Sequence, residues 1–194
     1  NLSECHQPLF KLIEEIADKG KNLARDMYGL NGWAVHHNIS IWREAYPSDG
    51  FVYWFFWNMS GPWLCNHIWE HYLYTKDIDF LKKYYPILKG SATFCSEWLV
   101  ENSEGELVTP VSTSPENAYL MPDGISASVC EGSTMDIAII RSLFSNTINA
   151  SKILQTDPLF CAELTQKVNK LKKYQIGSKG QLLEWDKEYM ENEP

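Results

Sequence analysis

The chain has 194 residues, a hydrophobic content of 44% and a formal net charge of −8. This composition supports a packed core, and the acidic balance without clusters of Lys and Arg argues against nucleic acid as a partner. No apolar run reaches the roughly 18 residues of a membrane-spanning helix, so we expect no insertion into a membrane.

The five cysteines are widely spaced and form neither a Cys-x-x-Cys pair nor a Cys/His pattern typical of metal ligands. An odd number also does not suggest a disulfide framework. We therefore expect buried free thiols, no metal site and no cofactor.

An amphipathic helix is predicted over residues 7–27, because apolar residues recur there with a helical period and a glycine follows. Residues 32–38 are predicted to be extended or looped and end in His36-His37-Asn38. Successive side chains of an extended chain point in opposite directions. We therefore expect one histidine to face a pocket and the other to support it.

The next part of the chain is rich in aromatic residues. Ser60-Gly61-Pro62 is interpreted as a break, after which residues 63–74 form a buried helix. Another helix is predicted over 77–99, with Asp77 as its N-cap. Pro86 should kink this helix or lie in its early turns.

The remaining elements are expected in the order of a short strand at 107–109, a loop at 111–117, a turn at 122–124, helices at 133–153 and 157–171, a loop at 174–181 and a short element at 182–185. Asp136 lies in the first turn of the longer helix, where the helix dipole favours a carboxylate, so we expect a capping role. Helices that alternate with long loops indicate an all-α fold, an α/α toroid or part of one.

The loop at 111–117 contains small hydroxyl residues, a proline and one carboxylate. Pro115 restricts its own backbone and biases Ser114 toward an extended conformation, so Glu116 is held on a shaped loop. A carboxylate on a loop over a helical scaffold is typical of the general acid of a glycosidase. The alternative is a solvated glutamate beside a helix N-terminus.

Several motifs occur together in one order along nearly the whole chain. They are Asn1-Leu2-Ser3-Glu4-Cys5-His6, Gly32-Trp33-Ala34-Val35-His36-His37-Asn38, Trp63-Leu64, His67-Ile68-Trp69-Glu70-His71-Tyr72, Ser112-Thr113-Ser114-Pro115-Glu116-Asn117, Pro122-Asp123-Gly124, Thr134-Met135-Asp136, Tyr174-Gln175-Ile176-Gly177, Gly180-Gln181-Leu182 and Glu184-Trp185. As a set they resemble glycoside hydrolase family 95, a family of α-L-fucosidases.

This resemblance implies an (α/α)6 barrel, of which residues 1–194 would be a fragment of one catalytic domain and about half of the barrel. It implies hydrolysis of terminal α-1,2-linked L-fucose with inversion at the anomeric carbon. Glu116 would be the general acid, and the catalytic base would lie outside this chain, so the isolated chain is expected to be inactive.

The candidate substrate-binding residues are His36, His37, Asn38, Trp42, Trp63, Glu184 and Trp185. The histidines and the asparagine can hydrogen bond to sugar hydroxyls, and the tryptophans offer either stacking surfaces or core packing. Glu184 and Trp185 belong to a motif that the resemblance places near the cleft.

The expected partner is a fucosylated oligosaccharide or glycan, and analogy with the family suggests a secreted or periplasmic protein. Three other readings stay open: a related α-L-galactosidase, a helical carbohydrate-binding domain without catalysis, and a structural helical domain. The oligomeric state is not predicted.

Overall fold

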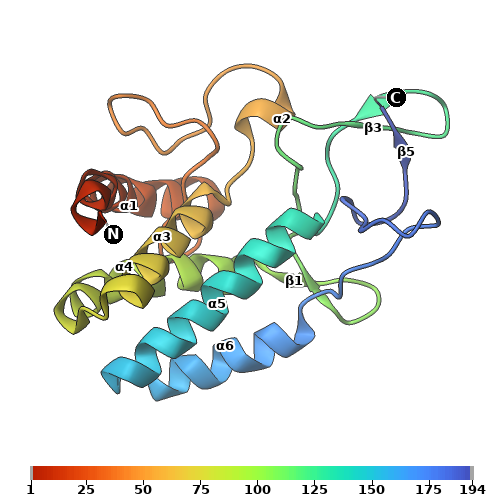
Figure 1. Cartoon of the computed structure of the whole chain (residues 1–194). Helices are drawn as coiled ribbons and strands as arrows, with labels where there is room; N and C mark the ends of the chain where they lie inside the picture. The colour runs from red at the N-terminus through yellow and green to blue at the C-terminus, as the bar shows by residue number, and fades with distance from the viewer. Residues whose placement is uncertain (1, 193–194) are drawn as a thin grey trace.

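The computed structural model describes residues 2–192 and consists mainly of helices joined by long loops (Figure 1). The helices are the 3-10 helix η1 (Ser3–His6), α1 (Gln7–Tyr28), α2 (Val52–Phe55), α3 (Ser60–Thr75), α4 (Ile78–Trp98), α5 (Thr134–Leu154) and α6 (Pro158–Lys170). The predicted all-α class with long loops and little β structure is confirmed. Within residues 2–192 the helices do not close into a ring.

The strands are two residues long and belong to two small antiparallel sheets. One sheet pairs β1 (Val100–Glu101) with β2 (Leu107–Val108), and the other has the order β4-β3-β5, with β3 (Tyr119–Leu120), β4 (Ser126–Ala127) and β5 (Met190–Glu191). The strand predicted at 107–109 is present as β2 over two of these residues, and the turn predicted at 122–124 is confirmed, with the Gly124 N–H donating to the Met121 carbonyl oxygen at 2.8 Å. The second sheet joins the end of the described chain to the segment that follows Glu116.

Helix α5 is central in the packing: α3 and α4 contact it, and so does α6. Helix α1 packs against α3 and α4. The main core lies between these helices and includes Phe10, Ile68, Leu88 and Phe144. The N-terminal ends of α3 and α5 both point to the upper part of Figure 1, where the long loops gather. This end of the helical layer carries the candidate site.

Helix α1 is terminated by Gly29, the residue after its last turn, whose φ of 67° is left-handed and whose N–H reaches the carbonyl oxygens of Ala24 and Arg25. The following turn brings the chain against α4. There the Trp33 backbone N–H donates to the Gly90 carbonyl oxygen at 3.4 Å, and the Trp33 indole N–H donates to the Ile87 carbonyl oxygen at 2.9 Å. Trp33 thereby anchors the extended segment that carries the histidines.

Ser60, Gly61 and Pro62 form the first turn of α3, so the predicted break at these residues is wrong. Proline fits this position because the first N–H groups of a helix have no intrahelical partner. The predicted N-cap of α4 is confirmed, since the Asp77 carboxylate accepts from the N–H groups of Asp79 and Phe80.

Candidate active site

Glu116 occupies the third position of a tight turn at 114–117. The Asn117 N–H donates to the Ser114 carbonyl oxygen at 3.1 Å, and Pro115 is in the second position. Glu116 has a φ of 63°, a left-handed conformation that usually requires glycine at this place in a turn. This conformation costs about 1–2 kcal/mol, so contacts around the turn must maintain it. Backbone strain of this kind is concentrated at functional sites.

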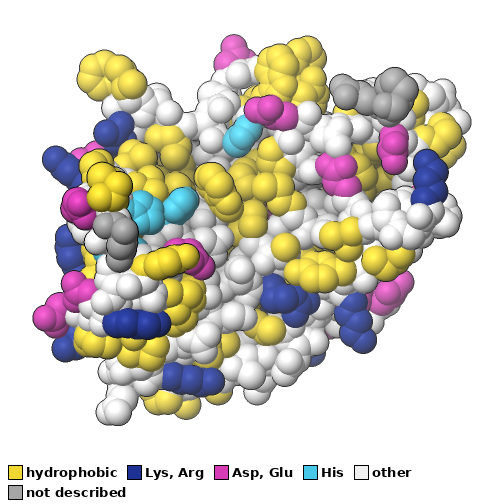
Figure 2. Space-filling view, in the orientation of Figure 1, with side chains coloured by type: hydrophobic (Ala, Val, Ile, Leu, Met, Phe, Trp, Pro, Cys, Tyr) yellow, Lys and Arg dark blue, Asp and Glu magenta, His cyan; other side chains and the backbone are white. Residues whose placement is uncertain are grey.

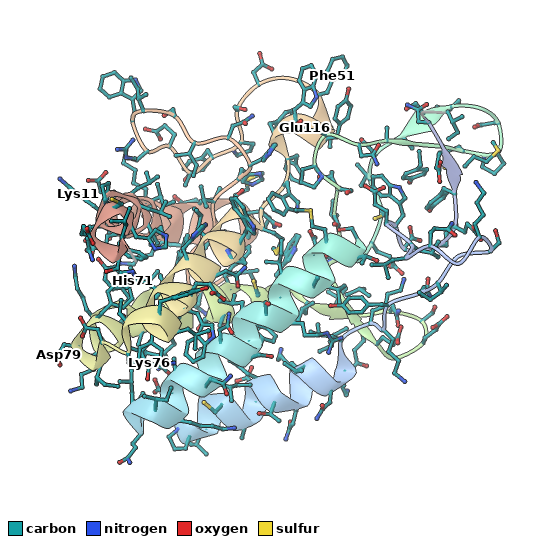
Figure 3. The ribbon with its side chains drawn as sticks, in the orientation of Figure 1. Lys11, Phe51, His71, Lys76, Asp79 and Glu116 are labelled. Carbon is teal, nitrogen blue, oxygen red and sulfur yellow. The ribbon has the colours of Figure 1, made fainter. Side chains whose placement is uncertain are left out.

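Helix α2 supplies one such contact. The Glu116 N–H donates to the Tyr53 carbonyl oxygen at 2.9 Å. Figure 3 shows Glu116 beside α2 and close to Phe51, at the upper edge of the molecule. The Glu116 side chain is exposed. The turn is therefore fixed by its backbone, while the carboxyl group stays accessible to a ligand.

An apolar hollow of about 290 Å³ lies next to this turn, with walls that include His37, Trp57, Trp63, Leu64, Pro115 and Met135. These residues come from the extended segment, the connection between α2 and α3, the start of α3, the Glu116 turn and the start of α5. Trp57 is buried, whereas the Trp63 side chain is 50% exposed. Figure 2 shows histidine, acidic and hydrophobic side chains gathered in the upper part of the molecule. A half-exposed indole in such a wall can stack on the apolar face of a sugar ring.

The two neighbouring histidines have different environments, in agreement with the predicted alternation. His36 is fully buried: its Nδ1–H donates to the Phe55 carbonyl oxygen at 3.2 Å, and its Nε2 accepts from the Tyr28 hydroxyl at 2.7 Å. Burial lowers the pKa of His36 to about 4, so the ring is neutral at pH 7. His36 therefore supports the loop and is not part of the hollow.

His37 lines the hollow. Its Nδ1–H donates to the Trp54 carbonyl oxygen, which fixes the orientation of the ring. The other ring nitrogen, Nε2, forms no hydrogen bond within residues 2–192. His37 can therefore offer Nε2 to a sugar hydroxyl.

Asn38 and Trp42 do not line the hollow. The Asn38 amide donates to the Ser48 hydroxyl at 3.0 Å and to the Trp54 carbonyl oxygen at 3.2 Å, so it holds the loop together. Trp42 is 72% exposed, and its carbonyl oxygen accepts from Lys19. The structure thus brings only His37 and Trp63, of the predicted residues up to residue 63, into the hollow.

Glu184 is linked to the residue that follows the predicted acid. Both of its carboxylate oxygens accept from the Asn117 side-chain amide at 2.8 Å. Trp185 is buried, and its ring meets that of Tyr119 edge-on with centroids 4.8 Å apart. Asn117, Glu184 and Trp185 also border a second, more polar hollow of about 280 Å³. Glu116 is therefore flanked in sequence by residues that border two different hollows.

Asp136 does not have the predicted capping role. Ser133 is the N-cap of α5, and its hydroxyl accepts from the Asp136 N–H. The Asp136 carboxylate is buried and accepts from the Trp57 indole N–H at 2.8 Å and from the Thr109 hydroxyl at 3.1 Å. These two hydrogen bonds were not predicted from the sequence. The only signals for them in the sequence are the aromatic run that contains Trp57 and the carboxylate in Thr134-Met135-Asp136.

Residues 2–192 contain no group of three or more His, Cys, Asp or Glu side chains placed to hold a metal ion. No helix in this range combines the length and apolar composition needed to cross a membrane. The five cysteines are free thiols, as predicted, although Cys5 is exposed and only the other four are buried.

Comparison with known proteins gives one consistent result. The family model for the glycosyl hydrolase family 95 catalytic domain matches residues 1–194. Alpha-L-fucosidase 2 of Arabidopsis thaliana is 40% identical over 195 aligned residues, which cover all of this chain and 23% of that protein. Probable alpha-fucosidase A of Aspergillus niger is 28% identical over 193 residues, covering 95% of this chain and 24% of that protein. The chain thus spans about a quarter of the length of these relatives.

Proposed function

Because the chain belongs to the glycosyl hydrolase family 95 catalytic-domain family, we propose that the complete protein hydrolyses terminal α-1,2-linked L-fucose from oligosaccharides or glycans. Inversion at the anomeric carbon and a role for Glu116 as general acid are parts of this proposal. The relatives named alpha-L-fucosidase and alpha-fucosidase support the choice of sugar.

The observation that carries this proposal is the position of Glu116. Its carboxyl group is exposed on a strained turn that is hydrogen bonded to α2, and Pro115 of the same turn borders the apolar hollow. A fucosyl residue has an apolar face that suits such a wall. The second hollow, beyond Asn117, offers room for the rest of the substrate. The acid would then lie between the two sugars that it separates.

Inversion requires a second carboxylate, which activates a water molecule on the opposite face of the sugar. The two carboxyl groups of inverting glycosidases are about 6.5–9.5 Å apart, which leaves room for this water. We propose that the base is contributed from outside residues 1–194.

The test is to follow fucose release from 2′-fucosyllactose by the complete protein with proton NMR. We expect β-L-fucose to appear first and then to equilibrate with the α anomer, because a single displacement inverts the α-linked carbon. If α-L-fucose appears first, the inverting mechanism is wrong. Lack of fucose release under conditions where an α-L-galactoside is cleaved would assign the protein to the related specificity.

Trp63→Ala in the complete protein should raise the KM for 2′-fucosyllactose about tenfold, equivalent to about 1.4 kcal/mol of binding. The reason is that Trp63 exposes half of its side chain in the wall of the hollow. Trp42→Ala is the matched control, because Trp42 is more exposed but does not border the hollow. An equal effect of the two substitutions on KM would rule out the hollow as the sugar site.

A further inference from the structure

A buried carboxylate joins the two chain segments that determine where Glu116 lies. Asp136 is fully buried in the first turn of α5. Its Oδ1 accepts from the Trp57 indole N–H at 2.8 Å, and its Oδ2 accepts from the Thr109 hydroxyl at 3.1 Å. One side chain of α5 thus holds a residue before α3 and a residue before the Glu116 turn.

The segment that leads to Glu116 is held at a second point close by. The Ser112 hydroxyl donates to the Ser133 hydroxyl oxygen at 2.7 Å, and this same oxygen accepts from the Asp136 N–H at 3.3 Å. Thr109 and Ser112 are therefore both attached to the N-terminal end of α5, Thr109 through Asp136 of the first turn and Ser112 through the N-cap Ser133. The beginning of the Glu116 loop cannot move independently of this turn.

The same two segments also meet at their other ends. Tyr53 lies four residues before Trp57, and its carbonyl oxygen accepts from the Glu116 N–H at 2.9 Å. Residues 53–57 and 109–116 are thus joined at one end through Asp136 and at the other through the Tyr53–Glu116 hydrogen bond. Asp136 completes this closed path of contacts.

The path includes Trp57, which forms part of the wall of the apolar hollow. Trp57 lines this hollow together with Pro115, the residue before Glu116. The distance between the wall and the Glu116 carboxyl group therefore depends on the contacts of Asp136. We propose that Asp136 is a positioning residue, which holds Trp57 and the Glu116 loop in the relative arrangement needed for proton donation to the leaving sugar. This inference rests on the proposed function, since it assumes that Glu116 is the acid.

A role in packing alone would not account for a carboxylate at this position. Charged groups are costly to bury, and apolar residues of similar volume often replace them without loss of stability. Burial does raise the pKa of Asp136 to about 6, although the surrounding hydrogen-bond donors act in the opposite direction. What the carboxylate provides, and an apolar side chain cannot, is a pair of acceptors for donors from two segments.

The test compares Asp136→Leu with Asp136→Asn in the complete protein. Leucine removes both acceptors. Asparagine keeps one acceptor for the Trp57 indole, and its amide can donate to the Thr109 hydroxyl oxygen. Thr147→Val is the control for a buried polar change in α5, because the Thr147 hydroxyl bonds only within its own helix. Melting temperatures verify that each variant is folded.

Two substrates separate positioning of the acid from general loss of active protein. Cleavage of 2′-fucosyllactose needs a proton donor, whereas α-L-fucosyl fluoride has a leaving group that departs with little protonation. In Asp136→Leu we expect kcat for 2′-fucosyllactose to fall about a hundredfold, as for a displacement of a catalytic group by about 1 Å, with a much smaller loss for the fluoride. In Asp136→Asn the ratio of kcat for 2′-fucosyllactose to kcat for α-L-fucosyl fluoride should be close to that of the wild type. Equal losses for the two substrates would overturn the proposal.

A second readout does not depend on activity. Hydrogen exchange in peptides covering residues 52–58 and 109–117 should be faster in Asp136→Leu than in the wild type or in Asp136→Asn. The reason is that leucine breaks the closed path of contacts at Asp136. Unchanged exchange in a folded Asp136→Leu protein would overturn the positioning role. If the wild type cleaves neither substrate, the proposed function fails by itself, and the exchange data still decide whether Asp136 holds the loop.

Discussion

Glu116→Gln in the complete protein is expected to lower kcat for 2′-fucosyllactose by about 10³–10⁴-fold, the upper part of the range for loss of a general acid. The leaving group is a sugar hydroxyl, which departs poorly unless it is protonated. Glutamine has nearly the shape of glutamate, but its amide is far too weak an acid to protonate the leaving oxygen. Initial rates of fucose release, measured beside the wild type, provide the test.

The substitution should leave the fold intact, because the contacts that fix the turn are made by the backbone. The Glu116 N–H still meets the Tyr53 carbonyl oxygen, and glutamine pays the same cost for a φ of 63°. Activity on α-L-fucosyl fluoride should therefore be largely retained. Glu104→Gln, which changes an exposed glutamate in the β1–β2 connection, is the control and should have no effect. Wild-type turnover of 2′-fucosyllactose by Glu116→Gln would remove Glu116 from the mechanism.

Gly32→Ala is expected to destabilise the protein by about 4 kcal/mol, a sum of left-handed backbone strain and overpacking. Gly32 has a φ of 80°, and an added Cβ would lie 2.7 Å from the Phe94 backbone nitrogen and even closer to the Gly90 carbonyl oxygen. These are backbone atoms of α4, which cannot move aside as a side chain could. Scanning calorimetry of the complete protein should show a marked fall in melting temperature.

Gly29→Ala separates the two contributions. Gly29 lies in the same turn with a φ of 67°, but an added Cβ there meets no atom within 4 Å. We expect this substitution to cost only about 1 kcal/mol, for the backbone conformation alone. If the two variants melt at the same temperature, the close approach of Gly32 to α4 adds nothing to the cost of Gly32→Ala, and the prediction is wrong.

The helices of this protein were predictable because their signals are local. Apolar residues recur with a period of 3.6 in α1, and caps such as Asp77 and Ser133 satisfy the first N–H groups of their own helices. The first turn of α3 was not predicted, because it contains Gly61 and Pro62, which usually interrupt helices. Here Gly61 lets the Trp33 ring come close, and proline fits the first turn.

The candidate site was predictable only in part. Pro115 and the hydroxyl residues before it indicated a shaped loop, and the structure shows the strained turn that holds Glu116. His37 and Trp63 line the hollow, as their residue types suggested, but Trp42 does not. Nothing in the residues around Trp42 distinguishes it from Trp57, since an indole has the same chemistry in either place. Which of them faces the hollow depends on the path of a long loop.

The amino-acid sequence by itself determined the all-α class, the turn chemistry at Glu116 and the family to which the chain belongs. Each of these follows from residues that are near one another in the chain or from an ordered set of motifs. Tertiary structure alone decided that Asp136 binds Trp57 and Thr109, which are 79 and 27 residues away. A buried carboxylate accepts hydrogen bonds from the donors that the packing of distant segments brings within about 3 Å. No local sequence pattern predicts which donors these are.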